Sequence, residues 1–188
     1  MISPGETLNR GHVVLIGGGA RSGKSSFALR RLLTHSNPAF IATARPLDDE
    51  MQLRIKRHQQ ERPATLPTIE APRDLCGALE EARGYDAVAV DCLTIWLSNV
   101  LVETESTTAA ENEIDRLCVA VQDCPFSLYL VSNEVGLGLV PETPLGRAFR
   151  DLAGGLHQRL SMKADEVIFS VMGMPLRLKP MPVEVLSI

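Results

Sequence analysis

The sequence has few aromatic residues, few cysteines and no long apolar run. Phe, Trp and Tyr make up 4% of its 188 residues, which argues against the basic, aromatic-bearing grooves that bind single-stranded nucleic acid. A formal net charge of −4 provides no general attraction to nucleic acid either. The four cysteines form no CxxC or Cys/His cluster, so neither a zinc site nor a disulfide framework is indicated. They are Cys76, Cys92, Cys118 and Cys124, and we expect reduced thiols.

No apolar run approaches the roughly 20 residues that a membrane-spanning helix needs. The first twelve residues, MISPGETLNRGH, lack the basic segment followed by an apolar segment that marks a signal peptide. We therefore expect a cytoplasmic protein with a flexible extension over residues 1–12 and a single domain over residues 13–188. We expect no nucleic-acid partner and no membrane span.

Short apolar runs alternate with longer helical patterns along the chain. The runs are continuously apolar, which is typical of strands buried on both faces of a parallel sheet. Expected strands cover 12–16, 39–44, 86–91, 126–132 and 166–172, and expected helices cover 24–34, 47–61, 73–83, 92–103, 110–122 and 145–162. The polar stretch 102–111 is expected to be an exposed loop. This order predicts a three-layer α/β fold with a mostly parallel sheet flanked by helices.

A phosphate-binding motif joins the first expected strand to the first expected helix. The sequence GGARSGKS at 18–25 matches the P-loop pattern GxxxxGK(S/T). Glycines let successive N–H groups face phosphate oxygens, and the helix N-terminus adds a positive dipole end. Lys24 is expected to reach the β- and γ-phosphates, and the Ser25 hydroxyl to bind Mg²⁺. The expected P-loop contacts are Gly18, Gly19, Ala20, Arg21, Ser22, Gly23, Lys24 and Ser25.

A second magnesium ligand is expected at the end of a neighbouring strand. Asp91 follows four apolar residues, so its carboxylate should stand at the sheet edge that carries the P-loop. Asp86 opens the same strand and should lie at the opposite edge. An Asp after a strand is ordinarily a helix cap, but the nearby P-loop favours a metal-binding role for Asp91.

The remaining motifs separate classes of P-loop protein. The Asn-Lys-x-Asp element with which regulatory GTPases recognise guanine is absent, and the DxxG-like quartet at 151–154 falls within an expected helix. A helix over 47–61 would place a small group of side chains on overlapping faces. They are Met51, Arg54, Ile55, His58 and Arg62. On this pattern alone, His58 is a surface residue beside a solvated basic face.

The chain resembles the bifunctional adenosylcobinamide kinase and adenosylcobinamide-phosphate guanylyltransferase family of cobalamin biosynthesis. The matching blocks cover most of the chain beyond residue 12: GGARSGKS (18–25), IATA (41–44), DDEMQLRIKRHQQERP (48–63), TIEAP (68–72), VDCLTIWLSN (90–99), SNEVGLGLVPE (132–142) and RAFRDLAGGLHQRLSMKADEV (147–167). The resemblance implies phosphorylation of the aminopropanol hydroxyl of adenosylcobinamide by GTP or ATP. It then implies transfer of GMP from GTP to that phosphate, with release of pyrophosphate.

The resemblance also implies roles for individual residues. In this family a histidine of the segment RIxxH carries GMP as a covalent phosphoramidate, and the pattern falls on Arg54, Ile55 and His58. His58 is therefore implied as a nucleophile, which suits an imidazole that is largely neutral near pH 7. Lys24 is the second implied catalytic residue, and a homotrimer is the implied assembly. Further implied nucleotide contacts are Ala42, Thr43, Ala44, Gln59, Gln60, Glu61, Arg62, Arg73 and Asp91.

Other positions carry weaker expectations. Glu70 is a candidate for metal or substrate contact, and Leu66 stands where family members often have a Trp that packs or stacks. Asn133 and Glu134 follow an expected strand and should emerge at the P-loop edge. Glu134 is a candidate to orient or deprotonate the corrinoid hydroxyl, while Arg147 and Arg150 are candidate phosphate contacts; each is otherwise a cap or a surface ion pair. A kinase without guanylyl transfer and a nucleotide-binding switch without transferase activity are the alternative functions.

Overall fold

A computed structural model describes residues 10–186 of the chain; positions 1–9, 187 and 188 lie outside the described residues. At its centre is an eight-stranded sheet in the order β3-β2-β4-β5-β1-β6-β7-β8. The first six strands in this order are parallel, whereas β7 and β8 each run antiparallel to the strand before them. The strands are β1 (Val13–Gly18), β2 (Pro38–Ala42), β3 (Thr68–Glu70), β4 (Ala87–Asp91), β5 (Ser127–Asn133), β6 (Glu166–Val171), β7 (Met174–Lys179) and β8 (Glu184–Val185).

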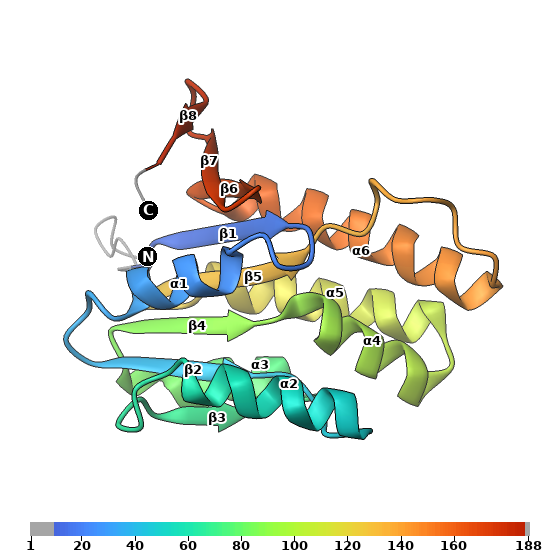
Figure 1. The fold of residues 1–188 in the computed structure, drawn as a ribbon, viewed down its shortest axis with the longest axis horizontal. Helices are drawn as coiled ribbons and strands as arrows, with labels where there is room; N and C mark the ends of the chain where they lie inside the picture. Colours follow the sequence, from blue (N-terminus) through green and yellow to red (C-terminus); the bar gives the residue numbers. More distant parts are fainter. Residues whose placement is uncertain (1–9, 187–188) are drawn as a thin grey trace, which may run out of the picture.

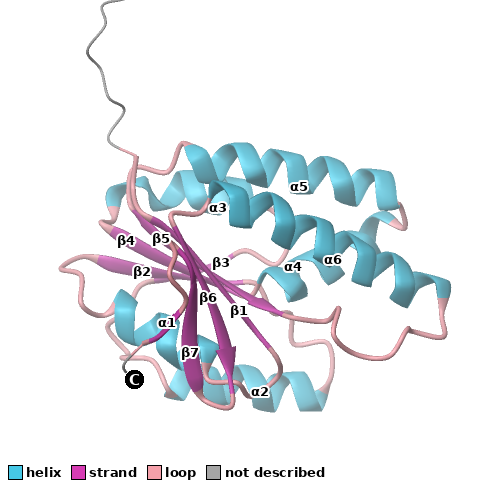
Figure 2. Cartoon of the chain, turned by 90° about the horizontal axis from the view of Figure 1, so that it is seen from above, coloured by secondary structure: helices cyan, strands magenta, loops and turns pink. Residues whose placement is uncertain are grey.

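Helices cover both faces of the sheet and complete the expected three-layer α/β fold. One face carries α1 and α2, and the other carries α3, α4, α5 and α6 (Figures 1 and 2). The helices are α1 (Lys24–Leu32), α2 (Asp49–Gln60), α3 (Leu75–Glu81), α4 (Leu93–Thr104), α5 (Thr107–Gln122) and α6 (Pro144–Lys163), with a 3-10 turn at Ala82–Gly84. Within residues 10–186, no helix is both long and apolar enough to cross a membrane.

The continuous apolar runs are buried between the two helical layers, as the sequence predicts. All four residues of β4 before Asp91 are fully buried, because each face of the strand is covered by helices. Trp96 of α4 is also fully buried, and its indole N–H donates to the backbone carbonyl of Arg73 at 2.9 Å. Leu66 packs into the core on the α1 side. The core thus fixes the strands whose ends build the site.

The carboxyl ends of the parallel strands meet at one edge of the sheet. The last residue of β1, Gly18, lies in register with Asn133 of β5, and Ala42 of β2 lies in register with Asp91 of β4. The P-loop and Asp91 are therefore at the same edge, as expected. Asp86 lies at the opposite edge, where its carboxylate accepts backbone N–H groups from the loop before β2.

Residues 102–111 and the strands β3, β7 and β8 differ from the sequence-based expectation. Residues 102–111 are not an exposed loop: α4 extends to Thr104, and α5 begins at Thr107 because Ser106 caps the N–H of Ala109 and Ala110 is buried against the core. The antiparallel hairpin of β6 and β7, with β8 beside it, is not expected from the sequence either. β6 itself is the strand expected over 166–172, but the burial of β7 is neither continuous nor regularly alternating, so the sequence signal of β7 is weaker.

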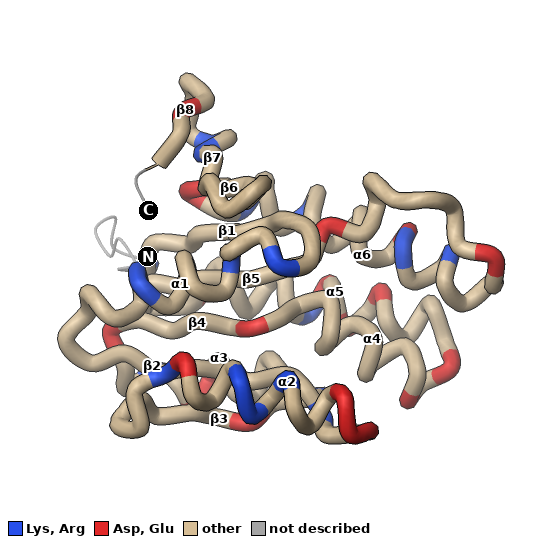
Figure 3. The backbone as a smooth tube through the Cα atoms, viewed as in Figure 1, with Lys and Arg blue, Asp and Glu red and all other residues tan. Residues whose placement is uncertain are grey.

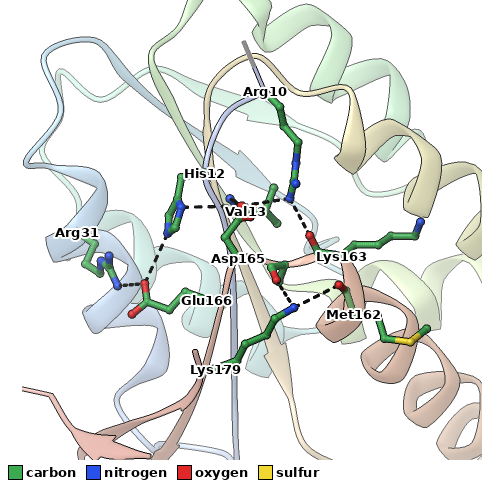
Figure 4. Close-up of polar contacts among 10 residues, drawn as sticks. Arg10, His12, Val13, Arg31, Met162, Lys163, Asp165, Glu166 and Lys179 are labelled. Carbon is green, nitrogen blue, oxygen red and sulfur yellow. Dashed lines mark hydrogen bonds and ion pairs between the residues drawn. The ribbon is translucent and has the colours of Figure 1, made fainter. Parts of the chain in front are cut away.

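The domain begins earlier than residue 13. Gly11 donates its N–H to the Cys124 carbonyl at 2.8 Å, and Arg10 pairs with Asp165 at 3.1 Å. Figure 4 shows this polar network, in which Lys179 of β7 also donates to backbone carbonyls at the end of α6. Residues 10–12 are therefore part of the folded domain rather than of a flexible extension. The rest of the expected extension, residues 1–9, lies outside the described residues.

Candidate functional site

The P-loop turns from β1 into α1, and two glycines make that turn possible. Gly18 has φ 151° and Gly23 has φ 88°, conformations that residues with a side chain rarely adopt. A Cβ on Gly18 would also lie 2.4 Å from the carbonyl oxygen of Ser170. Ser170 in turn donates its hydroxyl to the Ser22 carbonyl. The shape of the loop is therefore fixed both by its glycines and by contact with β6.

Lys24 is held inside the loop that it follows. Its side chain donates to the Gly19 carbonyl at 2.9 Å, and the residue is only 6% exposed. Burial lowers the pKa of Lys24, and the nearby Cys92 and Asp91 partly oppose that change. An ammonium group that has lost most of its water gains strongly from a phosphate anion. The Lys24 ammonium group is thus placed to bind an anion at the carboxyl end of β1.

Two adjoining hollows open at the carboxyl edge of the sheet. The first, which we call the sheet-edge hollow, lies between α2 and the ends of β2, β3 and β4; the second, the P-loop hollow, lies between the P-loop and α2. Four side chains line both hollows: Lys24, Ser25, Arg54 and His58. The P-loop and α2 therefore face one continuous space.

Most of the residues expected at the nucleotide site line these hollows. In the sheet-edge hollow they are Lys24, Ser25, Ala42, Ala44, His58, Gln59, Arg62, Asp91 and the weaker candidate Glu70. In the P-loop hollow they are Ala20, Arg21, Ser22, Gly23, Lys24, Ser25, His58 and Glu61. Gly18 and Gly19 form the base of the loop and line neither hollow.

Besides Gly18 and Gly19, three further expected contacts lie outside both hollows. Thr43 is fully buried, and its hydroxyl bridges the N–H and carbonyl of Cys92 at 2.8 and 2.9 Å. Arg73 pairs with Glu113 at 3.5 Å on the α5 side. Gln60 is exposed on α2. In this structure Thr43 positions the backbone beside Asp91, while Arg73 and Gln60 are not directed to the hollows.

Ser25 and Asp91 both line the sheet-edge hollow, and each has a side-chain oxygen. A hydroxyl and a carboxylate are the hard ligands that Mg²⁺ favours, and this ion usually completes its coordination with water and phosphate oxygens. The two residues therefore fit a magnesium ion bound together with a nucleotide.

Helix α2 presents His58 to both hollows. Asp48 caps the helix by accepting the N–H of Met51 at 2.7 Å. The acidic residues of α2 lie in its first turn, and its basic residues follow in the later turns (Figure 3). None of its residues is buried, and only Met51, Ile55 and His58 are half-buried. The His58 side chain is 38% exposed, with Nδ1 3.5 Å from a Glu61 carboxylate oxygen. The His58 side chain thus borders both hollows and is partly open to solvent.

Arg62 forms the wall of the sheet-edge hollow below α2. Its guanidinium stacks 4.2 Å from the centre of the Phe40 ring, and its Nε donates to the His58 carbonyl at 3.1 Å. Burial lowers the pKa of Arg62, with Asp91 and Glu70 opposing the change. This cation is fixed in place and faces two carboxylates across the hollow.

Some lining residues were not expected from the sequence. Phe40, Ile95 and Cys92 add apolar wall, and Thr68 adds a hydroxyl. Phe40 lies within β2, Thr68 begins β3, and Cys92 and Ile95 lie at the start of α4. Only the packing of these separate elements brings the four residues together. Asn133, which was expected at this edge, also lines the hollow, and its side-chain N–H donates to Thr94 at 3.1 Å.

The loop after β5 occupies the same edge (Figure 1). The backbone N–H of Glu134 donates to the Gly18 carbonyl at 3.0 Å, and the Glu134 carboxylate faces His157 of α6. Arg147 donates to the carbonyls of Pro141 and Glu142 at 3.0 and 2.7 Å. Its guanidinium therefore closes the loop onto α6.

Comparison with known proteins agrees with this geometry. A family model described as cobinamide kinase / cobinamide phosphate guanyltransferase matches residues 14–178. The chain is 43% identical over 171 residues to the bifunctional adenosylcobalamin biosynthesis protein CobP of Pseudomonas aeruginosa, covering 89% of this chain and 98% of the relative. It is 38% identical over 180 residues to the bifunctional adenosylcobalamin biosynthesis protein CobU of Salmonella typhimurium, covering 89% and 99%.

A solved structure of a Pyrococcus horikoshii OT3 protein shares the fold, with a TM-score of 0.58 and 10% identity over 93% of this chain and 90% of that chain. The residues that the family model matches include the whole P-loop and all of α2. On this match and on the two relatives, the chain belongs to the cobinamide kinase / cobinamide phosphate guanyltransferase family.

Proposed function

We propose that the protein phosphorylates adenosylcobinamide with a nucleoside triphosphate and then transfers GMP from GTP to the resulting phosphate. One observation carries the assignment of both steps to this site: Lys24, Ser25, Arg54 and His58 line both hollows. A triphosphate held by the P-loop would therefore extend along α2. The family membership supports the pair of reactions, and the shared lining supports a common nucleotide site.

In the kinase step, the P-loop N–H groups and Lys24 hold the β- and γ-phosphates. The hydroxyl oxygen of the aminopropanol arm bonds to the γ-phosphorus as the bond from that phosphorus to the β–γ bridging oxygen breaks. The nucleoside diphosphate leaves with the electron pair. Ser25 and Asp91 would hold Mg²⁺, which supplies charge neutralisation at the phosphate oxygens when bound.

In the guanylyl step, an imidazole nitrogen of His58 bonds to the α-phosphorus of GTP and pyrophosphate leaves. A phosphate oxygen of adenosylcobinamide phosphate then bonds to the same phosphorus, and the phosphorus–nitrogen bond breaks to free His58. Arg54 and Arg62 line the same hollow as His58, where their charges can bind the phosphate groups in transit. Covalent catalysis splits one transfer into two easier displacements.

The assembly implied by the family resemblance is a homotrimer, and we propose it for this chain. Apolar side chains in and beside β7 and β8 are exposed to solvent. They include Met172 at 90%, Met181 at 76% and Val185 at 63% exposure. Such a surface is commonly covered by another chain. Light scattering on the purified protein should give the mass of three chains, and the mass of one or two chains would contradict the proposal.

The function is tested by measuring the two reactions separately in wild type, His58→Ala and His12→Ala. The last variant is a matched control, because His12 lies at the opposite edge of the sheet with a 52% exposed side chain. We expect His58→Ala to lose GMP transfer while phosphorylating adenosylcobinamide within about threefold of wild type. His12→Ala should retain both reactions. A wild-type protein that phosphorylates adenosylcobinamide but releases no pyrophosphate from GTP would instead be the kinase without guanylyl transfer.

A further inference from the structure

Behind the end of β5 lies a chain of polar side chains that the two hollows do not include. Asn133 faces the sheet-edge hollow, whereas its neighbours in β5 and the following loop, Ser132 and Glu134, contact α6. The Ser132 hydroxyl lies 2.6 Å from Nε2 of His157, and Nδ1 of His157 lies 3.6 Å from a carboxylate oxygen of Glu134. Ser132 is fully buried, so it cannot meet a substrate.

The direction of this chain follows from what each group can donate. An ionised carboxylate only accepts, so the tautomer that suits this arrangement carries its proton on Nδ1, 3.6 Å from Glu134, and leaves Nε2 to accept the hydroxyl proton of Ser132. Burial lowers the pKa of His157, while Glu134 opposes the change. The imidazole is thus a neutral neighbour with Nδ1 on the side of Glu134. A neutral partner orients the carboxylate without cancelling its charge.

Glu134 is also fixed relative to the P-loop. Its N–H donates to the Gly18 carbonyl at 3.0 Å, one residue before the carbonyl of Gly19 that accepts from Lys24. Its second carboxylate oxygen accepts the N–H of Gly136. Among residues 10–186, the ion-pair contact of Glu134 is with His157 and not with a Lys or Arg. The side chain remains 26% exposed, so part of the carboxylate is open to a ligand.

The loop that follows Glu134 suits contact with the substrate that receives the phosphate. Leu137, Leu139 and Val140 are 82%, 95% and 67% exposed, and apolar side chains beside a polar site suit a large substrate with apolar faces. A carboxylate beside a triphosphate repels it, so its position favours a role other than phosphate binding. Accepting a proton from a hydroxyl that attacks the phosphate is such a role.

We propose that Glu134 accepts the proton of the substrate hydroxyl in the phosphorylation step and that His157 is the positioning residue that holds it there. The inference rests on the proposed kinase function. As the hydroxyl oxygen bonds to the γ-phosphorus and the nucleoside diphosphate leaves, the hydroxyl proton passes to the Glu134 carboxylate. Solvent at the exposed part of the side chain then removes that proton.

The test compares four variants with wild type in two assays. Phosphorylation of adenosylcobinamide gives kcat and the KM for the triphosphate, and labelling of His58 by α-labelled GTP serves as the internal control because it uses no substrate hydroxyl. Glu134→Gln should lower the phosphorylation kcat by about 10²- to 10⁴-fold. His157→Leu should lower kcat by about tenfold or more, with the KM for the triphosphate and His58 labelling within about twofold of wild type.

Two further variants separate positioning from structure. His157→Asn keeps a donor near the place of Nδ1 and should restore most of the kcat that His157→Leu loses. Gln158→Leu alters the exposed neighbour on α6 and should behave as wild type. If His157→Leu does not fold, Ser132→Ala takes its place: removing the hydroxyl that donates to Nε2 and fixes the ring should lower kcat by about threefold or more at unchanged KM.

Each contrary result overturns a defined part of the inference. A Glu134→Gln kcat within about threefold of wild type excludes Glu134 as the proton acceptor. Equal losses of phosphorylation and His58 labelling in His157→Leu, or a His157→Asn variant no faster than His157→Leu, exclude the positioning role. The absence of adenosylcobinamide phosphorylation by wild type would instead contradict the proposed function itself.

Discussion

The P-loop and α2 face the same ligand space but are held in place very differently. Ser22 and Lys24 of the P-loop are 7% and 6% exposed, and hydrogen bonds tie the loop to β6 and to itself. Helix α2 has no buried residue. The P-loop, which we call the cradle, is thus tightly packed, whereas the helix that faces it is loosely packed. The expected phosphate-binding residues are therefore packed into the core, whereas His58 lies on a helix that buries few side chains.

The largest expected effect comes from removing the positive charge of the P-loop. Lys24→Met should lower both reactions by about 10²- to 10³-fold, because each requires a bound triphosphate whose charge Lys24 offsets. The measurement is kcat/KM for phosphorylation together with the rate of His58 labelling. Thermal unfolding is the control: the variant should be no less stable than wild type, since it removes a buried charge. Loss of only one reaction would show that the two steps do not share the cradle.

The next largest effect should come from a glycine substitution in the same loop, which changes the stability of the domain. Gly18→Ala forces a Cβ against the Ser170 carbonyl at a φ that alanine disfavours, and should cost about 1–3 kcal/mol of stability. Thermal or urea unfolding measures the loss. Gly19→Ala is the matched control, because nothing lies within 4 Å of a Cβ there. Equal stability of the two variants would contradict the tight packing of the P-loop on β6.

The pH dependence of triphosphate binding should separate the cradle from α2. Because burial lowers the pKa of Lys24, the ammonium form that binds phosphate is complete below that pKa and is lost as the pH rises through it. The affinity for a non-hydrolysable triphosphate should therefore fall as the pH rises. This fall should occur at a lower pH than the range in which a lysine usually titrates. Isothermal titration over alkaline pH checks this. Lys24→Met should lack that decrease, and an unchanged slope in the variant would rule out Lys24 as its source.

The smallest effect should come from loosening α2. Asp48→Ala removes the cap that accepts the N–H of Met51, which should destabilise the helix locally by about 1 kcal/mol. Because the helix buries little, the global unfolding midpoint should hardly change. Hydrogen exchange should show faster exchange in α2 and unchanged exchange in β1 and α1. Faster exchange throughout the domain would mean that α2 is coupled to the core.

The P-loop, the buried strands and the side chains of α2 that face the site are predicted well from the sequence. The P-loop motif is local, and its strand, turn and helix follow one another in the chain, so its position and the role of its glycines are predictable. Strands such as β4 are continuously apolar because both faces are covered, and their limits agree with the structure within about two residues. The facing pattern on α2 also holds, since Met51, Arg54, Ile55, His58 and Arg62 all line the sheet-edge hollow.

The features that the sequence does not reveal depend on contacts between distant segments. A lone His157 in a helix carries no local sign that it meets Glu134, because only the packing of α6 on β5 brings them together. Strand β7 mixes exposed and buried positions at the sheet edge, so its pattern is weak. The polar composition of residues 102–111 suggests a loop, but the Ser106 cap and the burial of Ala110 favour a helix.

We infer that His58, facing a nucleotide held by Lys24, carries GMP between the two substrates. The most direct measurement is mass spectrometry of peptides from protein incubated with GTP, kept at alkaline pH to preserve a phosphoramidate. We predict one GMP adduct per chain, located on the peptide that contains His58 and absent from Lys24→Met. An adduct on another residue, or guanylyl transfer by a His58→Ala variant at the wild-type rate, would contradict this account.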